Sequence, residues 1–224
     1  IFVAHIEGGE VSGTVDGLIR HSVSKMAHLH FVANQEASKR LEQLGEDPQT
    51  IFIIGSPDID IMLSTALPSF DEVKKYYEIP FEHCGVVLFH PVTTELDDIY
   101  RQATALVDAL IESDRDYVVI YPNNDEGCSE IFTAYKMLEN NNQFRIFPSL
   151  RFEYFLSLLN HADFIIGNSS AGIREAPVFG VPCINVGTRQ DQRFQYHSVI
   201  NVPSQTSAIL QAINSLSNLK RCEP

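Results

Sequence analysis

Residues 164–193 contain the side chains best suited to binding and chemistry. The apolar run 164–166 has the length of a buried strand, and the small polar turn 167–172 follows it directly. A short helical pattern, 173–179, and a second strand come next. A strand, a Gly/Ser turn and a helix start together point free backbone N–H groups at an anion. The stretch therefore predicts a seat for a phosphate or diphosphate, with three side-chain donors: Ser169, Ser170 and Arg189.

Carboxylates follow the first apolar strand of the chain, residues 2–5. In open α/β sheets ligands bind beyond the carboxyl ends of the strands, so Glu7, Glu10 and Asp16 stand where a pair can act as acid and base. We expect Glu7 to be buried and unpaired at the strand end, which favours a functional role. Asp16 has a second interpretation, in which it only starts the helix that follows.

Four further side chains follow strands or begin helices, and each has a functional and a structural interpretation: His90, Asn123, Phe152 and Glu175. His90 could bind a phosphate as a cation or transfer a proton, or it could be a satisfied structural histidine. Asn123 lies in an Asn-rich turn, which is common for local reasons. Phe152 could flank a base, but an aromatic residue there is more often core. Glu175 could accept from ribose hydroxyls, or serve as a dipole or capping partner of its helix.

The elements that position these residues alternate between short apolar strands and amphipathic helical segments. Strict alternation predicts parallel sheets with helices on both faces, so we assign the chain to the α/β class with Rossmann-like topology. We place a boundary in the turn- and Pro-rich stretch 55–80, which leaves part of one domain at 1–56 and a whole domain at 57–224. The strands are expected at 2–5, 29–33, 51–54, 86–89, 117–121, 144–147, 164–166, 183–186 and 199–202. The helical patterns are 15–27, 35–44, 59–63, 96–112, 126–139, 152–160, 173–179 and 204–216.

Charge and composition limit the partners of the chain. Its 224 residues carry a formal net charge of −13, which argues against a nucleic-acid-binding or anionic-membrane surface. A phosphate site must therefore hold its basic residues locally. No apolar run approaches the ~20 residues of a membrane span. The four cysteines lack metal-finger spacing, so we expect reduced, structural cysteines in a cytoplasmic protein and no zinc site.

A series of short motifs in order resembles the UDP-N-acetylglucosamine 2-epimerase family, in its hydrolysing branch. The resemblance covers essentially the whole chain. The non-hydrolysing branch usually has Leu-Arg where this chain has Glu10-Val11, which favours the hydrolysing enzymes of sialic-acid-type sugar synthesis. The motifs are His5-Ile6-Glu7, Gly13-Thr14 with Asp16, Arg20-His21, Gly55-Ser56-Pro57, His90-Pro91-Val92-Thr93, Pro122-Asn123, Gly167-Asn168-Ser169-Ser170 with Gly172 and Arg174-Glu175, and Asn185-Val186-Gly187-Thr188-Arg189.

The resemblance implies two Rossmann-like domains in a GT-B arrangement, with the active site in the cleft. Ser169, Ser170 and Arg189 would serve the UDP diphosphate, Glu175 the ribose, and Phe152 would border the uracil. The full sets that it implies are Asn123, Phe152, Ser169, Ser170, Glu175 and Arg189 for UDP binding, and Glu7, Asp16 and His90 for catalysis, with His90 also facing phosphate.

The reaction that the resemblance implies removes the C2 proton of the sugar and expels UDP to give a 2-acetamidoglucal. Water then adds to yield N-acetylmannosamine. The resemblance implies no cofactor or metal; the partners would be the UDP-sugar, UDP and further copies of the chain in a homodimer or homotetramer. The sugar could be UDP-GlcNAc or a 2,4-diacetamido-6-deoxy relative. Three alternatives stay open: a non-hydrolysing epimerase, a GT-B glycosyltransferase and a non-catalytic nucleotide-sugar-binding module.

The chain begins in the middle of a strand pattern and without Met, from which we expect a fragment that lacks most of its first domain. In the family, that domain supplies a basic loop and a further catalytic Asp ahead of the His5-Ile6-Glu7 strand. We therefore expect this chain to keep much of the UDP site and to have little or no epimerase activity alone.

Overall fold

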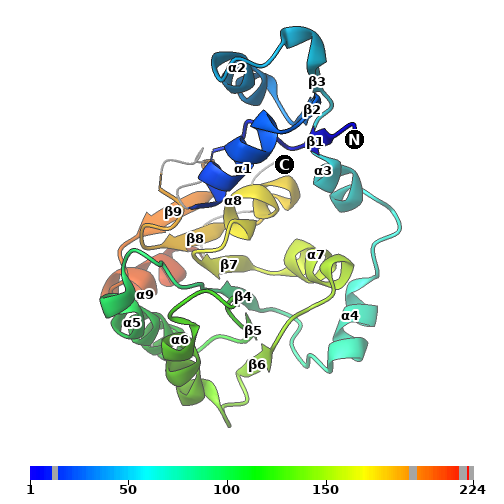
Figure 1. Cartoon of the computed structure of the whole chain (residues 1–224). Coiled ribbons are helices and arrows are strands. Elements are labelled where there is room, and N and C mark those ends of the chain that lie inside the picture. The colour runs from blue at the N-terminus through cyan, green and yellow to red at the C-terminus, as the bar shows by residue number, and fades with distance from the viewer. Residues whose placement is uncertain (12–14, 192–195, 217–220, 222–224) are drawn as a thin grey trace. The chain divides into compact units, whose positions relative to one another are not determined.

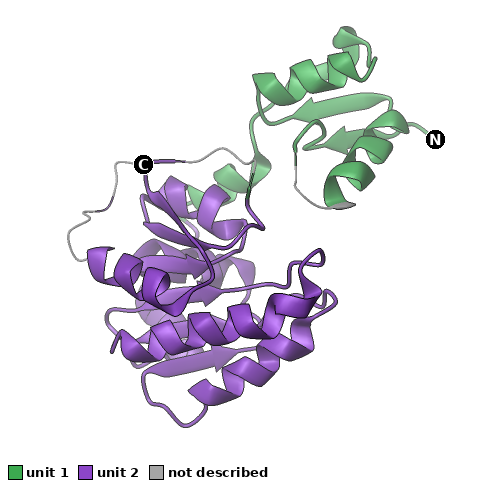
Figure 2. Cartoon of the chain, turned by 90° about the vertical axis from the view of Figure 1, so that its left-hand side faces the viewer, with its two compact units in different colours: residues 1–65, 191–193 green, residues 66–190, 194–224 purple. Residues whose placement is uncertain are grey.

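The computed structural model describes residues 1–11, 15–191, 196–216 and 221 (Figure 1). The chain divides into two compact units, each with its own sheet (Figure 2). Unit 1 is built on Ile1–Thr65, and unit 2 on Ala66–Gln190 and the described residues from 196 onward. The predicted motif residues Gly13 and Thr14, and the cysteine at 222, lie outside the described residues.

Unit 1 contains β1 (Ala4–Ile6), α1 (Val15–Lys25), β2 (Leu29–Val32), α2 (Gln35–Gln43), the 3-10 turn η1 (Pro48–Thr50), β3 (Ile51–Ile53) and α3 (Pro57–Met62). The three strands form a parallel sheet in the order β1-β2-β3. Asn34 starts α2, because its side-chain oxygen accepts a hydrogen bond from the Ala37 backbone N–H at 2.8 Å. The core is small, with Ile51 packed against the fully buried Val32, Ala37 and Leu41.

Unit 2 contains α4 (Phe70–Tyr77), β4 (Gly85–Leu88), η2 (Leu96–Asp98), α5 (Ile99–Glu112), β5 (Tyr117–Ile120), α6 (Cys128–Tyr135), η3 (Lys136–Leu138), β6 (Phe144–Phe147), α7 (Phe152–His161), β7 (Phe164–Gly167), α8 (Ala171–Arg174), η4 (Ala176–Phe179), β8 (Cys183–Val186), β9 (Val199–Val202) and α9 (Thr206–Ser215). Its six strands are all parallel, in the order β6-β5-β4-β7-β8-β9. The order reverses direction at β4, where a parallel α/β sheet opens a crevice for ligands.

Helices cover both faces of the unit 2 sheet, as the β–α alternation predicts. Successive strand residues point to opposite faces, so Val87 joins the core beneath α5, α6 and α9, while Val86 joins the core beneath α4, α7 and α8. Every residue of β4, β5, β7 and β8 is buried. These strands therefore have the rigid packing from which a site can be built.

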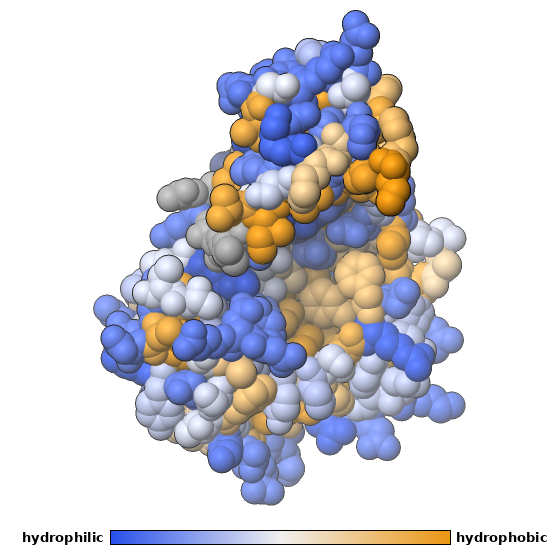
Figure 3. All heavy atoms as spheres, in the orientation of Figure 1, coloured by the Kyte–Doolittle hydropathy of each residue, from blue (hydrophilic) through white to orange (hydrophobic). Residues whose placement is uncertain are grey.

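Unit 1 is packed much less completely. No residue of β1 or β3 is fully buried, and Ile6, Phe52 and Ile53 are 56%, 44% and 50% exposed. Figure 3 shows apolar side chains of this kind, in orange, at the surface. Because hydrophobic burial is the main stabilising contribution to a fold, unit 1 gains less from its own core than unit 2 does.

All nine predicted strands are present in the described residues, with ends shifted by no more than two residues. The predicted helix at 173–179 is divided instead into α8 and η4, because Pro177 has no N–H and cannot continue an α-helix. The turn- and Pro-rich stretch 55–80 contains α3, near the helical pattern predicted at 59–63, and also α4, which was not predicted. A capping box starts that helix: the Glu72 N–H donates to Ser69 Oγ, and the Ser69 N–H donates to the Glu72 carboxylate.

Three cysteines lie in the described residues, and all three are free thiols: Cys84, Cys128 and Cys183. None of the helices in the described part of the chain combines the length and apolar character needed to cross a bilayer. In the same residues, no His, Cys, Asp and Glu side chains gather in a group of three or more that could hold a metal ion.

Candidate functional site

The carboxyl ends of four neighbouring strands meet at one edge of the unit 2 sheet. The register pairs Leu88 of β4 with Ile120 of β5 and with Gly167 of β7. Gly167 pairs in turn with Asn185 of β8. The next residues along each strand therefore form a row at this edge. They include four of the predicted site residues: Asn123 after β5, His90 after β4, and Ser169 and Ser170 after β7.

The Gly/Ser turn after β7 depends on glycine at two positions. Gly167 has φ +137°, and a Cβ there would lie 1.9 Å from the Leu88 carbonyl oxygen of β4. At Gly172, a Cβ would lie 2.3 Å from Cys183 Sγ, so α8 packs directly on β8. Both close approaches bring the turn down onto the strand ends, which is the arrangement that the sequence predicts.

Donors in this turn are available for an anion. Ser169 Oγ accepts from the Ala171 N–H at 3.3 Å, and both serines are half-buried. Within the described residues, the backbone N–H groups of Ser169 and Ser170 donate no hydrogen bond. However, α8 has only four residues, so its dipole is short and the individual N–H groups matter more than a helix dipole.

His90 is held as a neutral imidazole. The Asn123 backbone N–H donates to its Nδ1 at 3.1 Å. Burial lowers the pKa of His90 to about 4, and the Arg189 charge acts in the same direction while Asp125 opposes it. Near pH 7 these surroundings favour the neutral ring over the cationic form that the sequence also suggests. A neutral His90 can still donate a hydrogen bond, from Nε2.

The loop after β8 is fixed by two sets of contacts. Arg189 Nη1 and Gln190 Nε2 donate to the Asn168 carbonyl oxygen, at 3.3 and 2.7 Å. Thr188 Oγ1 donates to the Glu95 carboxylate, whose other oxygen accepts from Gln102 Nε2 at 2.6 Å. The predicted cation, Arg189, is thus anchored to the residue that directly precedes the serines of the turn.

The positions of Phe152 and Glu175 do not favour the structural roles considered for them, which were a core residue and a helix-capping residue. Phe152 is the first residue of α7, just after β6, and is 38% exposed, so it is not a core residue. Glu175 ends α8 and precedes η4, where it is half-buried and makes no side-chain capping hydrogen bond. Both residues keep their predicted functional roles as open predictions.

The predicted catalytic carboxylates belong to unit 1. Glu7 follows β1 in the left-handed region, at φ +60°, a conformation that is strained for a non-glycine residue and is common at functional sites. The expectation that Glu7 is buried and unpaired is wrong, because the residue is only half-buried and Ser56 Oγ donates to its Oε1 at 2.5 Å. Asp16 lies in the first turn of α1 and is exposed, and Glu10 accepts from Asn34 Nδ2 at 2.8 Å.

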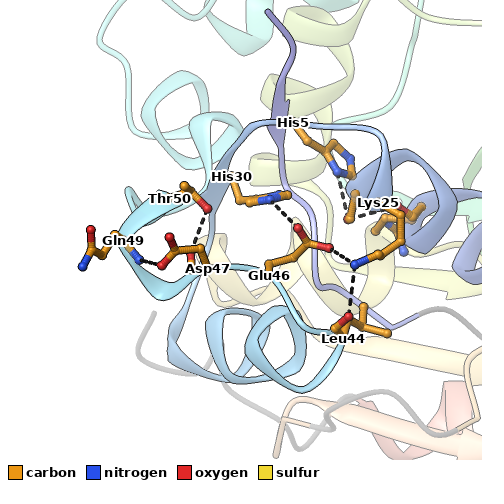
Figure 4. Close-up of polar contacts among 10 residues, drawn as sticks. His5, Lys25, His30, Leu44, Glu46, Asp47, Gln49 and Thr50 are labelled. Atoms are coloured by element: carbon orange, nitrogen blue, oxygen red, sulfur yellow. Dashed lines mark hydrogen bonds and ion pairs between the residues drawn. The ribbon is translucent and has the colours of Figure 1, made fainter.

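A polar network around the buried His30 joins α1 and the residues after α2 to β1 and β2 (Figure 4). His30 is 1% exposed, and its Nε2 lies 3.3 Å from a Glu46 oxygen, while Lys25 Nζ lies 2.7 Å from the other oxygen. His5 pairs with His30 across the strands, and its Nδ1 lies 3.0 Å from Ser24 Oγ. Burial, assisted by the His30 and Arg20 charges, lowers the pKa of His5. The network supports the strand that ends at Glu7.

The sequence interpretation missed the roles of Asn168, Ser56 and Gln190. Asn168 and Ser56 were noted only as members of motifs, because their partners lie 78 and 49 residues away along the chain. The sequence offered one indication of these roles: a polar residue between small residues at a strand end is expected to be buried and therefore hydrogen-bonded. The pairing itself could not be predicted from spacing.

The fold and the strand-end residues define a protein of Rossmann-like parallel α/β units, a class that binds ligands beyond the carboxyl ends of its strands. The chain belongs to the UDP-N-acetylglucosamine 2-epimerase family, whose sequence profile matches residues 1–223. It is 51% identical over 221 residues to the UDP-N-acetylglucosamine 2-epimerase of Neisseria meningitidis serogroup B, covering 99% of this chain and 58% of that protein.

Two further comparisons extend this likeness. The hydrolysing UDP-N,N'-diacetylbacillosamine 2-epimerase of Legionella pneumophila is 34% identical over 217 residues, covering 96% of this chain and 58% of that protein. The solved UDP-GlcNAc 2-epimerase of Methanocaldococcus jannaschii in complex with UDP-GlcNAc and UDP has a TM-score of 0.77 at 19% identity, covering 99% of this chain and 64% of that one. This chain therefore spans somewhat more than half the length of these relatives.

Proposed function

We propose that this chain is the UDP-binding part of a hydrolysing UDP-N-acetylglucosamine 2-epimerase. The observation that carries the proposal is the row of donors at the unit 2 sheet edge. In the described part of the chain, the backbone N–H groups of Ser169 and Ser170 make no hydrogen bond, and they lie at a strand end adjacent to those of Arg189 and the neutral His90. Such a set suits a diphosphate, because it supplies charge and several directed hydrogen bonds to a compact anion.

In this proposal UDP is the leaving group. The unit 2 donors stabilise the negative charge that develops on the diphosphate oxygen as the bond to sugar C1 breaks. Glu175 would bind the ribose, and Phe152 and Asn123 would lie near the uracil. Because the C2 proton is only weakly acidic, stabilisation of the departing diphosphate must lower much of the barrier.

Unit 1 would supply the acid and base. One carboxylate of the pair Glu7 and Asp16 accepts the C2 proton while the C1–O bond breaks, which forms a C1=C2 double bond and free UDP. Water then adds its hydroxyl to C1, and a proton returns to C2 on the opposite face. The sum is UDP-GlcNAc plus water giving UDP plus N-acetylmannosamine. Ser56 contributes by holding the Glu7 carboxylate through the 2.5 Å hydrogen bond.

A second candidate, a non-hydrolysing epimerase, has one observation in its favour. The relative that is 51% identical is named simply UDP-N-acetylglucosamine 2-epimerase, and the relative whose name says hydrolysing is 34% identical. Glu10-Val11 in place of Leu-Arg still favours hydrolysis, and the sugar could be a diacetamido relative of UDP-GlcNAc. A cytoplasmic location and assembly into a dimer or tetramer remain parts of this proposal.

One experiment separates these functions. A protein that carries this chain together with an N-terminal domain of the family is incubated with UDP-GlcNAc in heavy water, and the products are followed by phosphorus and proton NMR. Free UDP with N-acetylmannosamine deuterated at C2 supports hydrolysis, whereas a deuterated product that still carries UDP supports the non-hydrolysing enzyme. Absence of deuterium at C2 would exclude both and leave a glycosyltransferase or a binding module.

A further inference from the structure

Asn168 uses all of its hydrogen-bonding groups to join three strand ends. It is 1% exposed and directly precedes the two serines of the turn. Its Oδ1 accepts from the His90 backbone N–H at 2.7 Å, and its Nδ2 donates to the His90 carbonyl at 2.8 Å. Its own N–H donates to the Leu88 carbonyl at 3.0 Å, and its carbonyl accepts from Arg189 and Gln190.

We propose that Asn168 is a positioning residue for His90. It fixes the backbone of His90 so that the imidazole presents its Nε2–H to the diphosphate. This inference rests on the proposed binding of UDP. Asn168 itself is buried and is not expected to touch the ligand.

The geometry gives two constraints on His90. The paired hydrogen bonds to Asn168 fix both backbone polar groups of His90, at the point where the β4 pairing with β7 ends. The Asn123 N–H, from the neighbouring strand end, occupies Nδ1, so a neutral ring carries its proton on Nε2. Within the described residues Nε2 has no hydrogen-bond partner. The charged groups that act on the ring are Arg189 and Asp125.

A structural role alone would make a different prediction. A buried asparagine that only satisfies backbone groups should affect stability and leave the ligand site unchanged in the folded protein. Asn185 offers a matched control, because it is 2% exposed and its Nδ2 donates to Asn201 Oδ1 at 2.7 Å, on the far side of β8 from β7. Asn168→Ala leaves the backbone carbonyl that binds Arg189 in place, so it tests the His90 contact.

The first test is UDP binding by calorimetry to the wild-type chain and to Asn168→Ala, His90→Ala, the double variant and Asn185→Ala. We expect Asn168→Ala to weaken UDP binding about tenfold and Asn185→Ala to change it less than about twofold. Since Asn168 acts through His90, adding Asn168→Ala to His90→Ala should cost little more. If the losses of UDP affinity in the two single variants multiply in full in the double variant, the inference is overturned. If Asn168→Ala does not fold, Asn168→Asp keeps the acceptor for the His90 N–H and replaces the donor with a carboxylate oxygen, so its effect on the ring is then measured by the NMR test below, which needs no UDP.

The second test does not depend on UDP. Nitrogen-15 NMR of the His90 ring in the wild-type chain should show the Nε2–H tautomer between pH 6 and 8, and Asn168→Ala should shift those resonances while Asn185→Ala should not. Ring resonances that are the same in Asn168→Ala and wild type would overturn the inference. A wild-type chain that fails to bind UDP would instead count against the proposed function, and the NMR result would still decide the positioning role.

Discussion

Substitution of Gly167 by alanine should damage both the stability of unit 2 and its candidate site. The added Cβ would lie 1.9 Å from the Leu88 carbonyl oxygen and 2.5 Å from its carbon, and both are backbone atoms that cannot rotate away. The two strand ends would have to separate by more than about 1 Å, which weakens the hydrogen bond from the Asn168 N–H to the Leu88 carbonyl.

The cost has two parts. Alanine at φ +137° is strained by about 1–3 kcal/mol, and overpacking against a rigid neighbour adds about 1–3 kcal/mol. At roughly 2–4 °C per kcal/mol for a protein of this size, Gly167→Ala should lower the melting temperature by at least about 4 °C. UDP affinity should fall as well, because the same separation moves Asn168 away from His90.

Gly187→Ala is the matched control for this prediction. Gly187 also has positive φ, +79°, but its added Cβ would meet only Ser204 Oγ, at 3.0 Å, and a side-chain hydroxyl can rotate. We expect a cost of about 1 kcal/mol there. Calorimetric melting of both variants and wild type makes the comparison. A Gly167→Ala variant that melts within about 2 °C of wild type would refute the close approach of the two strand ends.

Four shorter predictions follow from the same contacts. Arg189→Ala should weaken UDP binding about tenfold or more, since it removes a charged donor, and unchanged affinity by calorimetry would sink the diphosphate assignment. Ser56→Ala, in a protein that carries this chain together with an N-terminal domain of the family, should lower kcat about tenfold with little change in KM, because it removes one hydrogen bond that orients the Glu7 carboxylate and touches no UDP-binding residue; a rise in KM as large as the fall in kcat would contradict this. The folded-state pKa of His90, about 4, lies below its ordinary value of 6.5, so the unfolded chain is protonated first as pH falls, and the stability from neutral His90 is complete above pH 6.5 and is lost toward pH 4. Urea unfolding should therefore show a steeper loss in wild type than in His90→Gln across that window, and parallel curves would argue against a buried neutral ring. Amide hydrogen exchange should be faster in β1 and β3 than in β4 and β7, and equal protection would show that the exposed apolar residues of unit 1 are covered in solution.

The fold could be predicted because its signals are local. Each strand is a short apolar run between turn residues, and those of unit 2 are buried on both faces, so their sequences are almost continuously apolar. The helix starting at Phe70 was missed although Ser69 and Glu72 form a capping box, because the prolines around it favoured a loop. Proline did interrupt the helical pattern 173–179, where α8 ends before Pro177 and η4 follows. The apolar spacing of that pattern could not show the interruption.

The site could be predicted only as a set of residue types at strand ends. That Ser169 and Ser170 would lie beside His90 followed once β4 and β7 were neighbours, but the strand order itself was not predicted. The pairing of Ser56 with Glu7 was missed for the same reason, since residues 49 positions apart are joined by the fold and not by a local pattern.

His90 shows why residue type alone misleads about chemistry. A histidine after a strand near a predicted phosphate suggests a cation, because the ordinary pKa of 6.5 lies close to neutral pH. The fold favours the neutral ring instead: burial lowers the pKa of His90 most, the Arg189 charge lowers it further against the opposing effect of Asp125, and the Asn123 N–H donates to Nδ1. Burying a second cation beside the Arg189 guanidinium would cost free energy. A neutral donor avoids that cost and can still make a directed hydrogen bond. In the proposed site, Arg189 would supply the charge and His90 the directed hydrogen bond, and Asn168 makes hydrogen bonds to both residues.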